Sequence, residues 1–182
     1  MAQPLYTYDD LLRTPEDNVR REIFAGVLHV SPSGTPSHQR LVVRLLMLLV
    51  GYASRHGGEA FVAPLDVVFD DINTAQPDDF YIGPERMHIV GERAIRGAPS
   101  LTVEVLSPSN SRHDTVIKAA MYARFGVPEY WIVDPKKRRI EQFWDAWGDR
   151  YTKSKVHESG ATMLAATLPE LACVLDDIIS AR

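Results

Sequence analysis

The longest regular pattern in the chain is that of an amphipathic helix in its first third. Its apolar residues recur every three or four positions, as one face of a helix requires: Leu41, Leu45, Leu48, Leu49 and Tyr52. Ser37 is a suitable N-cap for this segment, because its hydroxyl can accept a hydrogen bond from a free amide of the first turn. Gly57 and Gly58 are expected to end the helix.

Shorter elements are predicted before this helix. Residues Thr7 to Arg13 predict a short helix. Residues Asp17 to Phe24 predict a turn or a second helical piece that carries Glu22, and a glycine breaks that piece. Residues 27–30 then predict a short strand, which ends at the Ser-Pro-Ser-Gly turn of residues 31–34.

Beyond residue 60 the pattern changes to that of β-strands. Residues 61–69 are rich in β-branched residues, residues 77–82 predict another strand, and residues 101–106 predict a buried strand. A helix is expected over residues 114–125, followed by a strand at 130–133 and its hairpin partner at 138–144. This order predicts one α/β (α+β) domain over residues 1–182, with a mixed central β-sheet flanked by helices.

Composition excludes several classes of protein. Of the 182 residues, 45% are hydrophobic and 24% are charged, which excludes disordered and fibrous chains. The single cysteine, Cys173, cannot form an internal disulfide, and no cysteine–histidine cluster suggests structural zinc. The acidic N-terminal segment lacks the features of a signal peptide, and the most apolar stretch, 41–53, is too short to span a bilayer. A reducing cytoplasm is therefore the expected location.

Three charged residues are candidates for burial, and a buried charge must be compensated by a partner of opposite charge or by a metal. Glu104 lies in the middle of a predicted strand, where alternation places it on the face opposite Val103 and Val105. Asp78 starts another strand, and Lys118 lies on the helix that follows the strand of Glu104. Two carboxylates on adjacent strands can hold Mg2+, and a nearby lysine can stabilise charge on a phosphate or orient an attacking water. Together these groups would suffice to hydrolyse a phosphodiester.

Each of these residues also has a structural interpretation. Asp114 and Lys118 are spaced as an ordinary solvated ion pair of a helix surface. Glu104 could pair with an internal arginine, and Asp78 could belong to a turn. His38, near a helix start, is more often a capping or surface residue than a ligand.

Two runs of residues closely resemble the Uma2 family of putative restriction endonucleases. They are Val-Glu-Val-Leu-Ser-Pro-Ser at 103–109 and Gly-Val-Pro-Glu-Tyr-Trp-Ile-Val-Asp-Pro at 126–135, with Asp114 and Lys118 between them. Shorter pieces match upstream in the same order: Arg-Glu-Ile at 21–23, Ser-His-Gln at 37–39, Pro-Leu-Asp-Val-Val at 64–68 and Gln-Pro-Asp at 76–78. The resemblance implies the restriction-endonuclease-like fold of the PD-(D/E)XK nuclease superfamily.

The resemblance also implies roles for individual residues. Asp78 matches the aspartate of the superfamily motif and Glu104 its second acid, and these two would hold Mg2+ or Mn2+. Glu22 matches an acid that the superfamily often supplies from its first helical segment. Leu106 stands where the superfamily has its lysine, and in similar members that lysine is displaced to the next helix, which indicates Lys118. The supporting residues would be Asp114, which would orient Lys118, together with His38 and Asp66.

The charge distribution is consistent with a nucleic-acid partner. Residues 86–139 contain ten lysines and arginines against five acidic residues, which gives this segment a charge of +5. Since the whole chain has a net charge of −4, the rest of the chain has a charge of −9. Such basic residues would contact phosphates of DNA: Arg112, Lys136, Lys137, Arg138 and Arg139. A merely solvated basic loop is the alternative.

Three functions are compatible with these observations. The leading hypothesis is a Mg2+-dependent endonuclease that hydrolyses DNA, acting as a homodimer because two cuts in a duplex require two sites. The second is a catalytically idle nucleic-acid-binding or regulatory module that keeps the nuclease-like fold, which the leucine at position 106 favours. The third is a hydrolase that acts on RNA or on a nucleotide.

Overall fold

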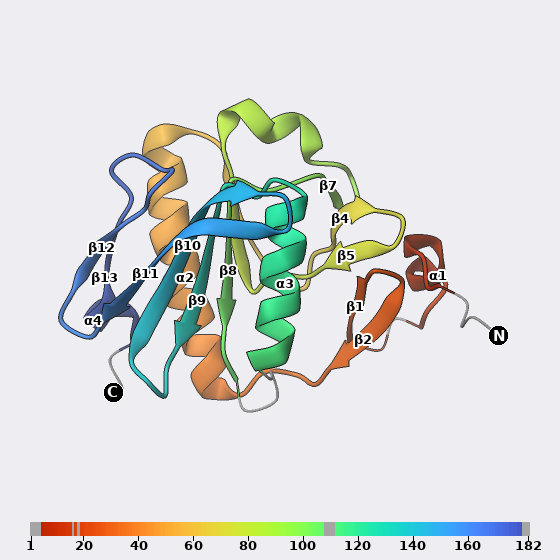
Figure 1. The fold of residues 1–182 in the computed structure, drawn as a ribbon, viewed down its shortest axis with the longest axis horizontal. Coiled ribbons are helices and arrows are strands. Elements are labelled where there is room, and N and C mark those ends of the chain that lie inside the picture. The colour runs from red at the N-terminus through yellow and green to blue at the C-terminus, as the bar shows by residue number, and fades with distance from the viewer. Residues whose placement is uncertain (1–4, 16, 18, 108–111, 180–182) are drawn as a thin grey trace.

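Runs of strands separate the helices in the computed structural model, which describes residues 5–15, 17, 19–107 and 112–179, the side chains of residues 112–114 excepted (Figure 1). The helices are α1 (Tyr8–Leu12), α2 (Pro36–His56), the 3-10 helix η1 (Pro84–Ile89), α3 (Arg112–Arg124) and α4 (Leu175–Ile179). The strands are β1 (Arg20–Phe24), β2 (Val27–Ser31), β3 (Glu59–Val62), β4 (Val67–Asp70), β5 (Asn73–Ala75), β6 (Asp79–Ile82), β7 (Ile95–Arg96), β8 (Leu101–Val105), β9 (Glu129–Asp134), β10 (Arg139–Trp147), β11 (Arg150–Glu158), β12 (Thr162–Leu164) and β13 (Ala172–Val174).

Helix α2 follows the predicted pattern, with one correction at its start. Its apolar face is buried, and the helix ends at Gly57, whose φ of 80° lies in the left-handed region that suits glycine. The N-cap is Thr35 and not Ser37: the Thr35 hydroxyl accepts a hydrogen bond from the amide of His38 at 3.3 Å. Pro36 is well suited to the first helical position because that residue needs no amide hydrogen, and the helix therefore begins before Ser37. Across the described parts of the chain, no helix is long and apolar enough to cross a membrane.

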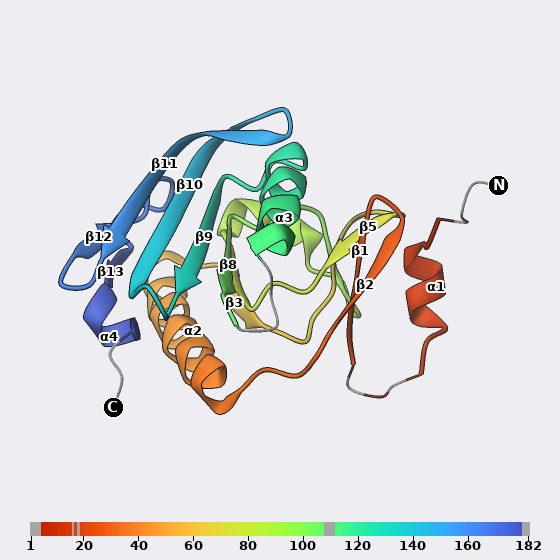
Figure 2. The ribbon, with the colours of Figure 1, turned by 60° about the horizontal axis from the view of Figure 1, so that its bottom comes forward.

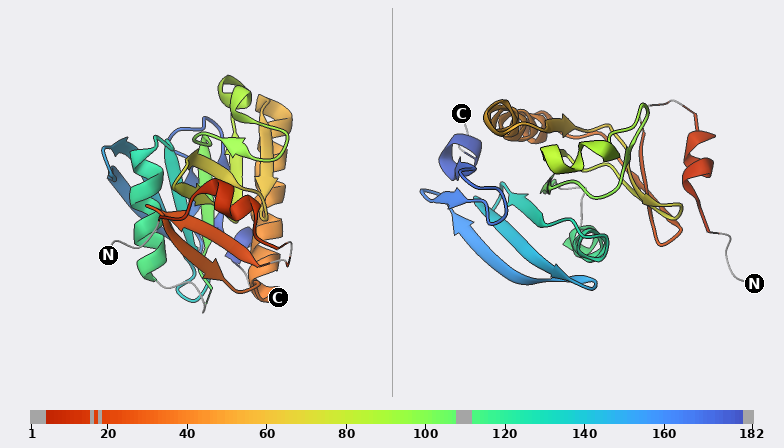
Figure 3. Two further views of the ribbon diagram at one scale, coloured as in Figure 1. Left: turned by 90° about the vertical axis from the view of Figure 1, so that its right-hand side faces the viewer. Right: turned by 90° about the horizontal axis from the view of Figure 1, so that it is seen from above.

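The central sheet has six strands in the order β11-β10-β9-β8-β6-β3. Strands β8 and β9 are parallel and are joined through α3, whereas the other neighbours are antiparallel. Helix α2 covers one face of this sheet and α3 the other (Figures 2 and 3). Alternation along β8 therefore has the predicted result: Val103 and Val105 pack in the cluster under α2, and Glu104 points to the side of α3, where it meets Lys118.

A second sheet, which the sequence did not predict, has the order β2-β1-β5-β4-β7. The expectation of one sheet is wrong because residues 61–69 form two strands and not one. Strand β3 joins the central sheet and β4 the second sheet, with Pro64, which has no amide hydrogen to donate to a sheet, between them. The predicted fold class is nevertheless confirmed, since mixed sheets are flanked by helices.

The segment that carries Glu22 is also a strand and not a helical piece. Strand β1 pairs with β2 in a hairpin whose two-residue turn consists of Ala25 and Gly26. Both turn residues have positive φ values, of 50° and 76°, as the tightest hairpin turns require. The turn residues and the pairing with β2 and β5 thus override the local helical preference, and Glu22 is held in the sheet.

Candidate active site

The predicted acidic residues meet where the two sheets adjoin. Glu22 comes from β1 of the second sheet, Asp78 directly precedes β6, and Glu104 lies on β8 of the central sheet. All three are buried, with 3%, 2% and 2% of their surfaces exposed. Three carboxylates can be buried together only if cations or hydrogen-bond donors compensate their charge.

Lys118 of α3 supplies one of these cations. Its Nζ lies 2.8 Å from Glu22 Oε1 and 2.9 Å from Glu104 Oε1, and only 5% of the residue is exposed. Burial alone would lower the pKa of Lys118, but the charges of Glu104 and Glu22 raise it above its ordinary value, so the side chain remains an ammonium. Lys118 is therefore a buried bridge between two sheets, not a member of a solvated surface pair.

Arg20 of β1 supplies the second cation. Its Nη1 lies 2.7 Å from Asp78 Oδ1, and its Nη2 lies 3.6 Å from both Glu22 Oε1 and Glu104 Oε2. Nη2 also donates to the backbone carbonyl of Gln76. Glu104 thus lies close to an internal arginine, as the structural interpretation of this residue expected. The same arginine also contacts the other two carboxylates.

The charge balance differs among the three carboxyl groups. Burial raises the pKa of Glu22, but Lys118 and Arg20 more than offset it, so the net shift is downward. Burial likewise raises the pKa of Glu104, Lys118 opposes this, and the neighbouring Asp78 carboxylate adds to it, so the net shift is upward. Three carboxylates face two cations, and Glu104 is the acid whose ionisation this cluster compensates least.

Asp78 is held by donors from three elements. Its Oδ2 accepts a hydrogen bond from the amide of Val105 at 2.8 Å, and its Oδ1 lies 3.4 Å from Nε2 of His38 on α2. Burial raises its pKa, but the hydrogen bond with His38 and the charge of Arg20 together hold that pKa well below its usual range. Asp78 is an anion that the fold fixes in place, and His38 is a buried member of the site, not a surface residue.

Two further residues fix the acids. Tyr122, one turn after Lys118 on α3, donates its hydroxyl to Glu104 Oε1 at 2.8 Å. The amide of Gln76 donates to Glu22 Oε1 at 2.8 Å, and the Gln76 side chain donates to Asp66 Oδ1 at 2.8 Å. Among the described contacts, Asp66 is linked to the site through Gln76.

Asp79 is the exception among the buried acids. Neither carboxyl oxygen has a hydrogen-bond partner within the described residues, and the residue is fully buried. Burial, together with the nearby charges of Asp78 and Glu104, raises the pKa of Asp79 to about 9. Asp79 is therefore protonated at neutral pH, unlike its neighbour Asp78.

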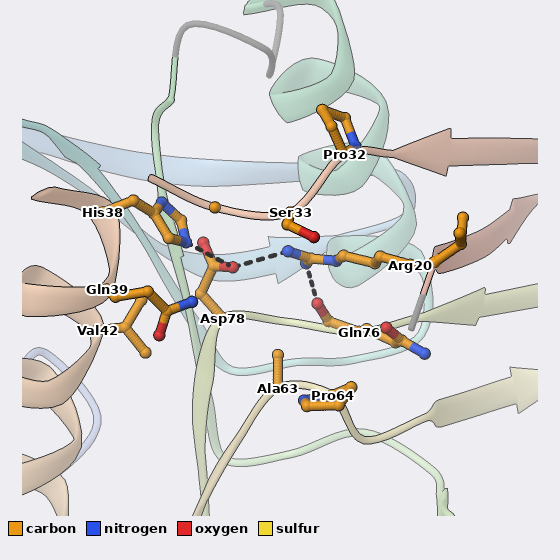
Figure 4. Close-up of a pocket in the computed structure, with 12 residues that line it drawn as sticks. Arg20, Pro32, Ser33, His38, Gln39, Val42, Ala63, Pro64, Gln76 and Asp78 are labelled. Carbon is orange, nitrogen blue, oxygen red and sulfur yellow. Dashed lines mark hydrogen bonds and ion pairs between the residues drawn. The ribbon is translucent and has the colours of Figure 1, made fainter. Parts of the chain in front are cut away.

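The site opens to a cavity of about 310 Å³ between the start of α2 and the segment after β2. Figure 4 shows Arg20 reaching across this cavity to Asp78, with His38 on the other side of the same carboxylate. Ser33 and Gln39 add polar groups to the wall. The volume is at the lower end of the range for small-molecule sites, and a phosphate group fits it.

The donor set suits a hard divalent cation. Asp78 and Glu104 approach the same guanidinium, so their carboxylates face a common position that favours positive charge. Mg2+ typically uses only one or two protein carboxylates together with water and phosphate oxygens. Within the described ranges no three histidine, cysteine or acidic side chains form a metal-binding group.

The predicted nucleic-acid-binding residues occupy different environments. Lys136 and Lys137 are exposed, and Lys136 lines a small cavity together with His38. Arg138 donates to Ser159 at 3.0 Å, and Arg139 pairs with Glu141. The side chains of Arg112 and Asp114 lie outside the described part of the structure, so neither proposed role is assigned a geometry.

Arg20 and Tyr122 are the site residues that sequence reasoning missed. Both had a usable signal. Arg20 is two residues before Glu22 and shares its face in a strand, but the helical prediction for this segment hid that relation. Tyr122 is four residues after Lys118 and shares its face on the helix.

Comparisons with known proteins indicate the family and the fold of the chain. The model of the Uma2 family, described as "Putative restriction endonuclease", matches residues 7–176. The fold is similar to that of a solved structure, a putative nuclease belonging to DUF820 from Anabaena variabilis ATCC 29413, with a TM-score of 0.80 and 20% sequence identity over 96% of this chain and 97% of that chain. No curated protein sequence matches the chain. At this identity the structural likeness establishes the fold alone.

Proposed function

The chain belongs to the Uma2 family of putative restriction endonucleases, and we propose that it is an endonuclease that hydrolyses DNA phosphodiester bonds with Mg2+ or Mn2+. The observation that carries the proposal is the buried cluster of Asp78, Glu104 and Lys118, linked through Arg20, in which Asp78 also lines a cavity that a phosphate can enter. A pair of copies would then cut the two strands of a duplex.

The proposed roles follow from the contacts of each side chain. Asp78 and Glu104 would hold the divalent cation, which supplies Lewis-acid stabilisation of the charge that develops on a phosphate. Lys118 uses two of its three N–H donors on Glu22 and Glu104, and among the described residues none accepts the third, which would be directed to a water or a substrate oxygen. Tyr122 and Glu22 keep Glu104 and Lys118 in position, since each contacts one of the two directly.

Cleavage assays on two substrates test the proposal. Duplex DNA and single-stranded RNA of the same sequence are incubated with the purified chain, in Mg2+ and in EDTA. We expect shortened DNA in Mg2+ alone. Cleavage restricted to RNA would instead support a ribonuclease, and DNA binding without cleavage would support the idle binding module, which the leucine at position 106 favours.

A divalent cation is expected to raise the melting temperature. At a concentration of 100 times its Kd, a bound ion adds about 2.7 kcal/mol to the free energy of unfolding, which is roughly 5–10 °C for a chain of this size. Asp78→Asn and Glu104→Gln should lose this gain, whereas the exposed control Glu158→Gln should keep it. Differential scanning calorimetry with and without MgCl2 measures the effect. Equal stabilisation of all four proteins would remove Asp78 and Glu104 from the metal site.

The four residues of the basic turn (Lys136, Lys137, Arg138 and Arg139) are expected to contribute unequally to DNA binding, the two lysines more than the two arginines. Replacing Lys136 and Lys137 by serine should reduce the slope of log affinity against log salt by about 0.9 for each phosphate that the turn no longer neutralises. Replacing Arg138 and Arg139 by serine should change the slope less, because these side chains already contact Asp176 and Glu141. Fluorescence anisotropy with duplex DNA at several salt concentrations measures both slopes. Unchanged slopes in both variants would show that the turn does not contact DNA.

A further inference from the structure

The guanidinium of Arg20 contacts both Asp78 and Glu104, the two carboxylates that would hold a divalent cation. Its contacts are to Asp78 Oδ1 at 2.7 Å and to Glu104 Oε2 at 3.6 Å. Lys118 and Tyr122, in contrast, both contact the other oxygen of Glu104, Oε1. The two cations of the cluster are therefore not equivalent: Lys118 leaves Glu104 Oε2 accessible and Arg20 does not.

A divalent cation and this position of Arg20 exclude each other. A cation held by Asp78 and Glu104 would compete with Arg20, which contacts both carboxylates, and two positive groups within a few ångströms repel strongly in a buried site. Lys118 can stay where it is when such a cation binds, because its partners are Glu22 and the opposite oxygen of Glu104. Arg20 is the residue that has to move.

The adjoining cavity offers Arg20 a second position. Arg20 lines this cavity of about 310 Å³ together with Ser33 and Gln39, and 18% of its side chain is exposed. Its Nε atom is buried without a hydrogen-bond partner in the described part of the chain, so the present position does not satisfy the whole guanidinium. In the cavity the planar guanidinium could bind a phosphate through two parallel hydrogen bonds.

We propose that Arg20 is a mobile substrate-binding residue that leaves the space between Asp78 and Glu104 when a divalent cation binds there and turns into the cavity to contact a phosphate of the nucleic acid. This inference rests on the proposed function, from which it takes the cation site and the substrate class. It predicts that metal binding and phosphate binding by Arg20 are coupled. Without a metal, Arg20 stays paired with Asp78 and Glu104 and does not contact the substrate.

The first test is the affinity for Mn2+, measured by isothermal titration calorimetry without nucleic acid. Arg20→Gln should bind Mn2+ about ten- to a hundredfold more tightly than the wild type, because no charge-assisted hydrogen bond has to break. The matched control is Arg21→Gln. Arg21 is adjacent in sequence but pairs with Asp17 at 2.7 Å, so its replacement should leave the affinity unchanged. Unchanged or weaker binding by Arg20→Gln would overturn the proposal.

The second test asks when Arg20 contacts DNA. Binding of duplex DNA is measured against salt in Ca2+, which also prefers carboxylate oxygens, and in EDTA. In Ca2+ the slope of log affinity against log salt should be smaller by about 0.9 for Arg20→Gln than for the wild type. In EDTA the two slopes should agree. An equal difference under both conditions would show that Arg20 does not move with the metal.

A variant that keeps a cation covers the case in which Arg20→Gln does not fold in EDTA. Arg20→Lys has a single ammonium nitrogen in place of the two Nη atoms that contact Asp78 and Glu104 separately, so it keeps fewer of these contacts, and its Mn2+ affinity should exceed that of the wild type by a few fold. An affinity equal to the wild type would overturn the proposal. The result is separable from the proposed function. A chain that shows the Arg20 effects but leaves DNA intact contradicts only the nuclease activity, and cleavage without those effects contradicts only this inference.

Discussion

Replacing Lys118 by alanine is expected to slow DNA cleavage about a hundred- to a thousandfold, because one preorganised charged donor at a reacting centre contributes roughly that much. The same change should lower the free energy of unfolding by about 3–5 kcal/mol, since it leaves Glu22 and Glu104 buried without their shared cation. A solvated surface pair would contribute only about 0.3–0.5 kcal/mol. Single-turnover cleavage rates and urea midpoints measure the two effects.

A charge-keeping variant of Lys118 and a control at another lysine separate the effect of charge from that of geometry. Lys118→Arg should restore only part of the rate, because a planar guanidinium does not fit the place of a compact ammonium between two carboxylates. Lys153→Ala is the matched control: Lys153 pairs with Asp145 at 3.2 Å, is 59% exposed and lies on β11. It should retain the wild-type rate and stability. Near-wild-type cleavage by folded Lys118→Ala would show that the lysine of this site is elsewhere.

Replacing Asp79 by asparagine is expected to stabilise the protein at neutral pH. Because the pKa of Asp79 is raised from 3.8 to about 9, the folded chain holds a proton between these pH values that the unfolded chain has released. The free energy of unfolding of the wild type therefore falls as the pH rises through this window. Asparagine has a similar shape and no such cost, so the gain at pH 7 should be about 2–4 kcal/mol.

Urea unfolding at several pH values in EDTA checks this prediction. The wild type should lose stability between pH 5 and pH 8 relative to Asp79→Asn, and the difference between the two should grow with pH. Asp149→Asn, at an exposed turn, should follow the wild type. A variant less stable than the wild type at pH 7, or one with the same pH dependence, would show that Asp79 is ionised in the folded protein.

The local elements were predictable where one short-range pattern decides them. The helical repeat of α2 and the alternation of β8 place Leu45 and Glu104 on the faces that the structure has. The strand β1 was not predictable in this way, because its conformation depends on the Ala25–Gly26 turn and on pairing with two other strands. For the same reason the second sheet was missed.

The candidate site residues were indicated by their place in the predicted strands and helix and by resemblance to a family, but their energetic relations were not predictable from spacing. The position of Arg20 depends on Asp78 and Glu104, which are 58 and 84 residues away in sequence. The contrast between Asp78 and Asp79 is equally hidden, since the two aspartates are adjacent and differ only in what their side chains meet. Donors surround Asp78, whereas Asp79 meets no hydrogen-bond partner among the described residues.

Conversion of supercoiled plasmid to nicked and linear forms tests the central claim most directly, with wild type and Glu104→Gln purified in parallel and assayed at equal concentration in Mg2+ or EDTA. Glutamine keeps the size of Glu104 and an oxygen that can accept from Tyr122, but it removes the charge that a divalent cation needs. We expect conversion by the wild type in Mg2+ and neither conversion by Glu104→Gln nor conversion in EDTA. Equal conversion by both proteins, conversion that persists in EDTA, or an intact plasmid after incubation with metal-bound wild type would contradict the proposal.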